Sequence, residues 1–216
     1  RRAKERWPVA YLTGAREFWS MSFRVTPDVL IPRPETETLV RVAVDLKPRR
    51  VAELGIGSGC VSAALARELP DAEIVALDCS PAALEIARQN LAQLGFADRV
   101  TLVEASGLGE LSGPFDLVVS NPPYVQEGDL AGLAPELRHE PRVALDGGPD
   151  GLHAVRRLCA EAPALLERPG HLALEIGLGQ ADAVEELLRA SGAAVVERYP
   201  DLAGIPRVVV GRFLEI

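Results

Sequence analysis

The sequence contains little lysine, asparagine and cysteine. Its 23 basic residues are almost all arginine, with lysine only at positions 4 and 47, and 31 acidic residues leave a formal charge of -8. A protein that binds nucleic acid through the phosphates needs a basic face, so this balance argues against that mode, although a local basic patch stays open. Scarce lysine and asparagine are weakly typical of heat-adapted proteins. We therefore hypothesise a thermophilic origin, which a thermal midpoint in the ordinary mesophile range would remove.

Long apolar runs are also absent. None approaches the roughly 20 residues that a membrane span requires, so we expect no membrane association. The three cysteines, Cys60, Cys79 and Cys159, form no CxxC pair and lie in apolar segments, which predicts reduced core thiols and a cytoplasmic protein. The three histidines are far apart in sequence, so we expect no metal site.

From residue 50 onward, strand and helix patterns alternate regularly. Apolar runs predict strands at 51–54, 74–77, 100–103, 115–119, 172–176, 194–199 and 208–213. Helical periodicity predicts helices that begin near 36 and at 58–69, 80–95, 152–166 and 181–190, with Ser80 as a cap and Gly95 as a stop. Such alternation predicts an α/β fold with a doubly wound, mostly parallel seven-stranded sheet and a C-terminal antiparallel hairpin at its edge.

The first 31 residues differ from this pattern. Alternating apolar residues at 18–25 predict a small N-terminal hairpin that ends at the turn Pro27-Asp28. Because the chain begins abruptly at Arg1, we expect an upstream part to be missing. We therefore divide the chain into residues 1–31, a linker with the hairpin, and residues 32–216, the sheet domain.

A rigid turn, Asn121-Pro122-Pro123-Tyr124, directly follows the predicted buried strand at 115–119. Proline fixes φ and restricts the residue before it, so the path of this turn is fixed. The side-chain oxygen of Asn121 and the carbonyl of Pro122 become two acceptors at a set separation, and Tyr124 adds a flat face. The turn predicts a site for a planar NH2 group, which adenine and a glutamine amide suit equally. Tyr124 could alternatively be a core aromatic that caps the turn.

Two further motifs follow strand ends. The glycine turn Gly55-Ile56-Gly57-Ser58-Gly59 lets a ligand approach the backbone, and its GxGxG spacing is tighter than the GxGxxG of dinucleotide sites. Asp78 ends the second strand, where a carboxylate can bind ribose hydroxyls, or can instead cap the helix near Ser80. Since the carboxyl ends of parallel strands share one edge, the glycine turn, Asp78 and Asn121 are predicted to meet there.

These motifs resemble class I S-adenosylmethionine-dependent methyltransferases, which have a Rossmann-like fold and act on amide or exocyclic amino nitrogens. Further segments make the chain similar to the peptide chain release factor glutamine methyltransferases. They are residues 11–14 (YLTG), 29–37 (VLIPRPETE), 140–141 (EP), 144–148 (ALDGG) and 175–177 (EIG). The match covers essentially the whole chain from Tyr11 onward.

The resemblance implies an enzyme of translation termination. It would transfer a methyl group from S-adenosyl-L-methionine to the N5 amide nitrogen of the glutamine in the GGQ motif of class I release factors, leaving S-adenosyl-L-homocysteine. Its cofactor site would comprise Gly55, Ile56, Gly57, Ser58, Gly59, Asp78, Ser106 and Asn121. The glutamine would be held by Asn121, Pro122, Pro123 and Tyr124, of which Asn121, Pro122 and Tyr124 would be catalytic. We expect a monomer that binds a release factor and no nucleic acid, with the family's N-terminal helical domain preceding Arg1.

One departure from the family pattern is Ala105-Ser106, where an acidic–aromatic pair commonly lies beside the adenine. Glu104 or backbone groups would then contact the adenine. Glu35 and Glu37 lie at a helix start, where complementing the helix dipole is the expected role, and the hairpin residues Trp19 and Phe23 are expected in the core rather than over the site.

Other functions stay open on the residues alone. A nucleic-acid adenine-N6 methyltransferase would share the Asn-Pro-Pro-Tyr turn and would flip its base into the same pocket, but the acidic charge counts against it. A ribosomal-protein glutamine methyltransferase is closer, and the IPRPETE segment favours the release factor branch. A non-enzymatic cofactor-binding module is the alternative of a different class.

Overall fold

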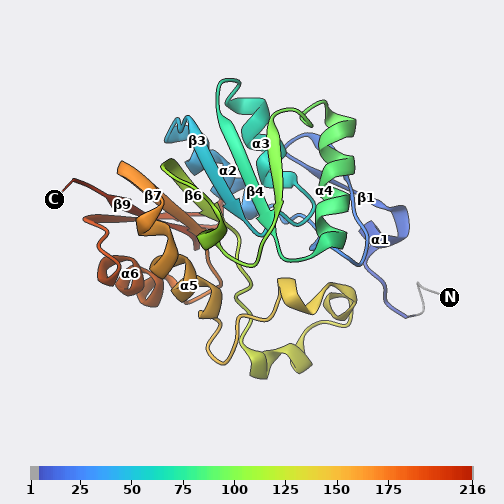
Figure 1. Ribbon diagram of the computed structural model, residues 1–216. Helices are drawn as coiled ribbons and strands as arrows, with labels where there is room; N and C mark the ends of the chain where they lie inside the picture. The colour runs from blue at the N-terminus through green and yellow to red at the C-terminus, as the bar shows by residue number, and fades with distance from the viewer. Residues whose placement is uncertain (1–4, 216) are drawn as a thin grey trace.

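The structure is a computed structural model that describes residues 5–215. Its main sheet has seven strands in the order β5-β4-β3-β6-β7-β9-β8 (Figure 1). They are β3 (Arg50–Leu54), β4 (Glu73–Asp78), β5 (Val100–Glu104), β6 (Phe115–Ser120), β7 (Leu166–Glu175), β8 (Val195–Pro200) and β9 (Pro206–Phe213). Strand β3 pairs in parallel with both β4 and β6, and only β9 runs against its neighbours. The predicted doubly wound, mostly parallel sheet is confirmed.

The predicted C-terminal antiparallel hairpin lies at the edge of the sheet, and the structure adds the order of its two strands. Strand β9 inserts between β7 and β8, and β8 forms the edge. The reason is the burial that each strand requires: β9 carries the run Val208-Val209-Val210, which is buried on both faces, whereas β8 exposes Glu197 and Arg198. A fully apolar run needs both faces covered, and a charged strand suits an open edge.

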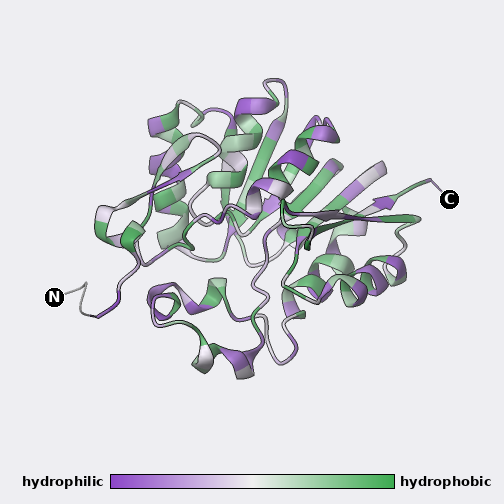
Figure 2. Cartoon of the chain, turned by 180° about the vertical axis from the view of Figure 1, so that it is seen from behind, coloured by the Kyte–Doolittle hydropathy of each residue, from purple (hydrophilic) through white to green (hydrophobic). Residues whose placement is uncertain are grey.

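Helices cover both faces of the sheet. One face packs against α2 (Thr36–Asp45), α3 (Cys60–Glu68) and α4 (Pro81–Leu94), and the other against α5 (His153–Glu161) and α6 (Ala181–Ala190). Successive strand residues alternate between the two cores, as Val51 and Ala52 do. Figure 2 shows these strands as hydrophobic along much of their length, whereas the helices carry both hydrophilic and hydrophobic residues.

Helix boundaries follow the predicted signals at α4 and depart from them at α5. The Ser80 hydroxyl accepts a hydrogen bond from Ala83 N at 3.2 Å, and Gly95 ends α4 with φ of 81°. Helix α5 was predicted to run to residue 166, which is wrong. It ends at Glu161, and a short 3-10 turn containing Pro163 leads into β7 at Leu166. Proline lacks the N–H that a continuing helix needs.

The N-terminal hairpin packs on the same body. Helix α1 (Val9–Thr13) precedes β1 (Ala15–Phe18) and β2 (Met21–Arg24), which pair antiparallel as predicted. Phe23 is fully buried, Trp19 packs against the same core, and the Trp19 N–H donates to Glu37 Oε1 at 2.9 Å. The charged start at residues 1–4 lies outside the described residues.

Of the cysteines, Cys60 and Cys159 are buried, but Cys79 is exposed. The prediction of a core thiol is wrong at Cys79 because the chain leaves the sheet directly after Asp78. Within residues 5–215, no helix is both long enough and apolar enough to cross a membrane.

Candidate functional site

A cavity of about 340 Å³ opens where β3, β4 and β6 end. This is the place in an open α/β sheet where the strand order reverses and ligands bind. The predicted site residues in its wall are Gly55, Ile56, Gly57, Ser58, Asp78, Ser106, Asn121, Pro122 and Pro123. Gly59 and Tyr124, also predicted, are not in this wall. In the described part of the chain, no group of three or more His, Cys, Asp or Glu side chains could hold a metal ion.

The glycine turn depends on left-handed backbone conformations. Gly55, Gly57 and Gly59 have φ of 80°, 54° and 84°, which strain any residue with a Cβ atom. The N–H groups of Gly55 and Ile56 donate to Leu77 O at 2.8 and 2.9 Å, so the turn is attached to the end of β4. Gly59 caps the start of α3 and positions that helix without lining the cavity.

Asp78 connects the glycine turn to α4. Its Oδ2 accepts from Gly57 N at 3.0 Å and its Oδ1 from Ser80 N at 2.9 Å. The carboxylate also lines the cavity, and each oxygen keeps a second lone pair. The two roles considered for Asp78, a helix-start partner and a ribose acceptor, are therefore compatible.

Glu53 is a site residue that the sequence analysis missed. It lines the cavity at 2% exposure and accepts a hydrogen bond from the Ser62 hydroxyl. Burial raises its pKa to about 8, with the Asp78 charge adding to the shift and the Ser62 hydrogen bond opposing it. The available signal was an acid in an otherwise apolar strand, just before a glycine turn. The nearby Ser58 hydroxyl is buried with no hydrogen-bond partner among the described residues.

The Asn-Pro-Pro-Tyr turn is held at both ends. The Ser120 hydroxyl donates to Leu54 O at 2.7 Å, and Asn121 Nδ2 donates to Thr36 Oγ1 at 3.2 Å. At the far end, Gln180 Nε2 donates to Tyr124 O at 3.2 Å. Because the NH2 end of Asn121 donates to Thr36, its side-chain oxygen is available as an acceptor for a ligand at the wall of the cavity.

Tyr124 is half-buried and lies beside Gly177. A Cβ atom on Gly177 would come within 3.0 Å of the Tyr124 ring and 2.9 Å of Gln180 Oε1, so a side chain there would displace these two groups. Burial raises the pKa of Tyr124, as does the Glu175 charge, while Arg33 opposes the shift. This placement agrees with the alternative role considered above, an aromatic that caps the turn.

Two loops close one side of the cavity. Residues 29–33 and 140–144 are joined by Glu140, which is buried, pairs with the Arg33 guanidinium and accepts from Ile31 N at 3.1 Å. Pro32 and Val143 from these loops line the wall. The IPRPETE segment therefore forms part of the cavity wall, and an ion pair that no local pattern indicated joins it to a distant loop.

The remaining side involves Arg157 of α5, a second residue that was missed. Arg157 lines the cavity, donates to Ser106 O at 2.7 Å and pairs with Glu161 at 2.6 Å. Glu161 in turn accepts from Leu108 N at 2.7 Å, so this pair orders the loop after β5. Glu104, considered as an adenine contact, is absent from the cavity wall, whereas Ala105 is present.

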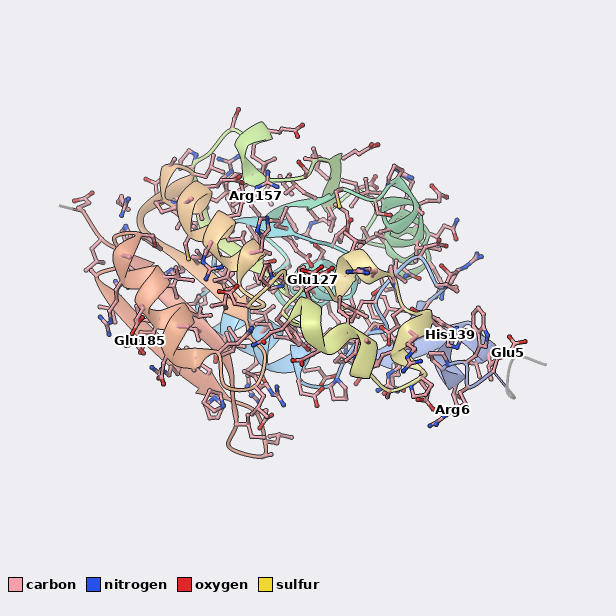
Figure 3. All side chains as sticks on the ribbon, turned by 90° about the horizontal axis from the view of Figure 1, so that it is seen from below. Glu5, Arg6, Glu127, His139, Arg157 and Glu185 are labelled. Atoms are coloured by element: carbon pink, nitrogen blue, oxygen red, sulfur yellow. The ribbon has the colours of Figure 1, made fainter. Side chains whose placement is uncertain are left out.

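Figure 3 shows that the labelled His139, Glu5 and Arg6 gather at one end of the molecule, away from Arg157. His139 Nε2 lies 3.0 Å from Glu5 O, and its ring stacks on Trp7 at 4.5 Å. These contacts attach the loop of residues 126–145, which lies below the sheet in Figure 1, to the N-terminal segment. His139 is thus occupied in packing.

The site offers two kinds of chemistry in one cavity. Glu53, Asp78 and the unpartnered Ser58 hydroxyl suit the amino and hydroxyl groups of a nucleoside that carries an amino acid, and the cavity volume is in the range of small-molecule sites. Asn121 and Pro122 present acceptors for a planar NH2 group at the same cavity. The arrangement can therefore place such a ligand beside an amide.

Comparison with known proteins gives three concordant findings. The family model described as "Methyltransferase small domain" matches residues 34–148. Release factor glutamine methyltransferases from Bradyrhizobium diazoefficiens and Moorella thermoacetica are 47% and 48% identical, over 95% and 93% of this chain and 72% and 73% of their own. The crystal structure of a release factor-specific protein-(glutamine-N5) methyltransferase from Alicyclobacillus acidocaldarius is 32% identical with a TM-score of 0.53, covering 89% of this chain and 100% of that one.

Proposed function

The chain belongs to the release factor glutamine methyltransferases, and we propose that its cavity brings S-adenosyl-L-methionine beside a glutamine amide held by Asn121 and Pro122. Its activity is the transfer of a methyl group to a release factor glutamine. The observation that supports this use of the cavity most directly is the Asn121 amide. Its NH2 group donates to Thr36, which leaves the side-chain oxygen as an acceptor in the same cavity as the carboxyl groups of Glu53 and Asp78.

The residues of the first two strand ends fit the methyl donor. We assign Asp78 to the ribose hydroxyls and Glu53 to the amino group, with the turn Gly55, Ile56, Gly57 and Ser58 around the methionine part. Gly59 contributes by capping α3. Ser106 and Ala105 border the base, where Arg157 holds the Ser106 carbonyl. When bound, S-adenosyl-L-methionine supplies an electrophilic methyl group on a sulfonium and leaves as S-adenosyl-L-homocysteine.

Asn121 and Pro122 address the weakness of an amide as a nucleophile. The nitrogen lone pair of an amide is delocalised into its carbonyl, so the enzyme must position it. Acceptors at Asn121 Oδ1 and Pro122 O would take the two N–H bonds and direct the lone pair into the cavity. Positive charge that develops on this nitrogen then faces two carbonyl dipoles fixed by the turn, and one of the two N–H protons leaves to give the neutral N-methyl amide. Pro123 keeps those dipoles in place, since both prolines restrict the backbone.

Tyr124 has a supporting part in this proposal. Its ring lies beside Gly177 rather than in the cavity wall, and Gln180 holds its carbonyl. We assign it to the outer border of the glutamine site, where a flat aromatic face suits a planar amide. Its second contribution is to fix the end of the turn.

The partner in this proposal is a class I release factor that presents its GGQ loop, in the cytoplasm, to a monomeric enzyme. The relatives' shared name supports the release factor as substrate. A single species at the monomer mass in sedimentation experiments would support the assembly state, and a dimer would contradict it.

The decisive experiment is labelled methyl transfer from S-adenosyl-L-methionine. Three acceptors are compared: a class I release factor, the same factor with the GGQ glutamine replaced by alanine, and DNA. We expect label only in the intact release factor. Label that survives loss of the glutamine, or that enters DNA, would overturn the assignment of Asn121 and Pro122 to the glutamine amide.

A further inference from the structure

A buried carboxyl group lies behind the amide of Asn121. Glu175 is the last residue of β7, is 2% exposed, and is absent from the cavity wall that Thr36 and Asn121 help to form. Its Oε2 atom has no hydrogen-bond partner among the described residues. Burying a carboxyl in this way is unfavourable unless nearby groups compensate, so its presence calls for a reason beyond packing.

Thr36 connects this carboxyl to the amide. Asn121 Nδ2 donates to Thr36 Oγ1 at 3.2 Å, and Thr36 is itself 2% exposed. A hydroxyl that accepts one hydrogen bond still has its own hydrogen to donate. Ser120 pairs with Leu174 across β6 and β7, so Asn121 and Glu175 lie at neighbouring strand ends. The side chains of Thr36 and Asn121 lower the pKa of Glu175 and so favour its ionised form.

We propose that Glu175 is a positioning residue that acts through Thr36 to keep the Asn121 amide oriented with its oxygen toward the substrate nitrogen. This inference rests on the proposed function. A flipped amide would turn its oxygen toward the Glu175 carboxylate, which only accepts hydrogen bonds, and toward the Thr36 hydroxyl, whose hydrogen is donated to Glu175 in this proposal. The buried carboxylate therefore permits one of the two amide orientations and disfavours the other.

Glu175 also strengthens the acceptor that the substrate meets. A negative charge near the NH2 end of an amide polarises the group and makes its oxygen a better acceptor, an effect that a low-dielectric interior enlarges. The two acceptors of the turn would then respond more strongly to positive charge on the substrate nitrogen. Because this benefit grows in the transition state, its loss should lower kcat rather than raise KM.

The ionisation of Glu175 links this device to pH. Burial raises its pKa to about 7, Glu35 raises it further, and Thr36, Asn121 and Arg207 lower it. The other ionisable groups that face it are Cys60 and Tyr124. The ionised fraction of Glu175 thus increases as pH rises through neutrality. Because the ionised form orients Asn121, kcat should rise over the same range.

Three variants test the proposal: Glu175→Gln, Thr36→Val and Thr36→Ser. We measure kcat and KM for release factor methylation, the Kd for S-adenosyl-L-methionine, and thermal unfolding. Glu175→Gln and Thr36→Val should lower kcat about 10- to 100-fold, which is no more than the fall caused by removing a direct hydrogen bond to the transition state. KM and Kd should change less than about threefold. Thr36→Ser restores the hydroxyl and should recover most of kcat.

A pH series separates positioning from mere packing. The kcat of the unmodified protein should rise between about pH 6 and pH 8 as the group with a pKa of about 7 ionises, and Glu175→Gln should flatten this rise. Glu197→Gln, on the exposed edge strand β8, is the matched control and should keep both the rate and the pH profile.

The outcomes distinguish this inference from the proposed function. If the unmodified protein does not methylate the GGQ glutamine, the proposed function fails. If it does, and Glu175→Gln and Thr36→Val keep kcat within twofold, or Thr36→Ser is as slow as Thr36→Val, the positioning role is wrong. Should Glu175→Gln not fold, the comparison of Val and Ser at position 36 decides alone.

Discussion

The two sides of the cavity are assembled from different parts of the chain. The side assigned to the methyl donor uses Glu53, the glycine turn, Asp78 and Ser106, which lie in or just after the last residues of three neighbouring strands within one half of the sequence. The side assigned to the glutamine joins Asn121 to Thr36 and Glu175, and its outer wall joins Arg33 to Glu140. These partners are separated by 85 residues for Asn121 and Thr36 and by 107 for Arg33 and Glu140.

The comparison shows where specificity is built. Contacts to the methyl donor depend on local backbone geometry, in which glycine conformations and a strand-end carboxylate suffice. Contacts to the glutamine depend on buried polar groups whose hydrogen bonds form only when distant segments pack together. Binding of the methyl donor should therefore tolerate changes on the glutamine side of the cavity, whereas methyl transfer should be lost when any one partner on the glutamine side is removed.

The largest expected effect is on Asn121. Asn121→Ala removes the oriented acceptor, so kcat should fall about 10³-fold, in line with the loss of a preorganised group in other active sites. The Kd for S-adenosyl-L-methionine, measured by calorimetry, should change less than about threefold because the donor side is intact. A parallel loss of donor binding would mean that the two sides are not separable.

The ion pair between the two loops comes next. Arg33→Ala would leave the buried Glu140 carboxylate without its cation, which should lower the free energy of unfolding by roughly 2–3 kcal/mol, given that the Arg33 side chain is partly exposed. Arg88→Ala, which breaks the exposed pair with Glu85, is the matched control and should leave the unfolding midpoint unchanged. Equal effects in denaturant unfolding would refute the importance attached to burial.

A smaller effect is expected for Asp78. Asp78→Asn keeps the shape of the side chain but removes the charge that strengthens its hydrogen bonds, so donor affinity should fall about tenfold. With the donor saturating, kcat should stay within about threefold. Calorimetry measures the donor affinity and single-turnover rates measure kcat. A large fall in kcat at saturating donor would mean that Asp78 acts in methyl transfer and not only in donor binding.

A change of stability with pH is expected from Glu53. Between its ordinary pKa of 4.5 and the raised value of about 8, the folded protein retains a proton that the unfolded chain has lost, so stability should decline as pH rises through this window. Glu53→Gln should reduce that decline, and denaturant unfolding at pH 5 and pH 8 measures it. Glu175 contributes a change of the same sign up to about pH 7, so part of the decline should persist. An unchanged slope in the variant would count against the raised pKa.

The same difference explains what could be predicted from sequence. The GxGxG turn, Asp78 and the Asn-Pro-Pro-Tyr turn are contiguous patterns whose geometry follows from glycine, proline and strand periodicity. The capped helix α4 was predicted for the same reason, because Ser80, Pro81 and Gly95 each act within a few residues. Local chemistry determines these features, so one sequence suffices to find them.

The missed features depend on tertiary contacts. Arg157 reaches the cavity only because α5 packs beside the loop after β5, and Glu140 meets Arg33 only because two loops close on one wall. The order of β8 and β9 within the predicted hairpin could not be predicted, because pairing with β7 is decided by burial on both faces, which periodicity in one strand does not reveal. Glu53 was visible as an acid in an apolar strand, but only its burial indicates its importance.

The insertion of β9 has a consequence for synthesis of the protein. Strand β9 follows every other strand of the sheet along the chain, and it places Val208 opposite Glu175 while Ile176 N donates to Arg207 O at 2.9 Å. A nascent chain can therefore form the part of the cavity assigned to the methyl donor while Glu175, behind Asn121, still lacks its pairing with β9. We expect methyl transfer only once β9 has emerged from the ribosome and inserted between β7 and β8. Until then, the incomplete enzyme would bind S-adenosyl-L-methionine without consuming it.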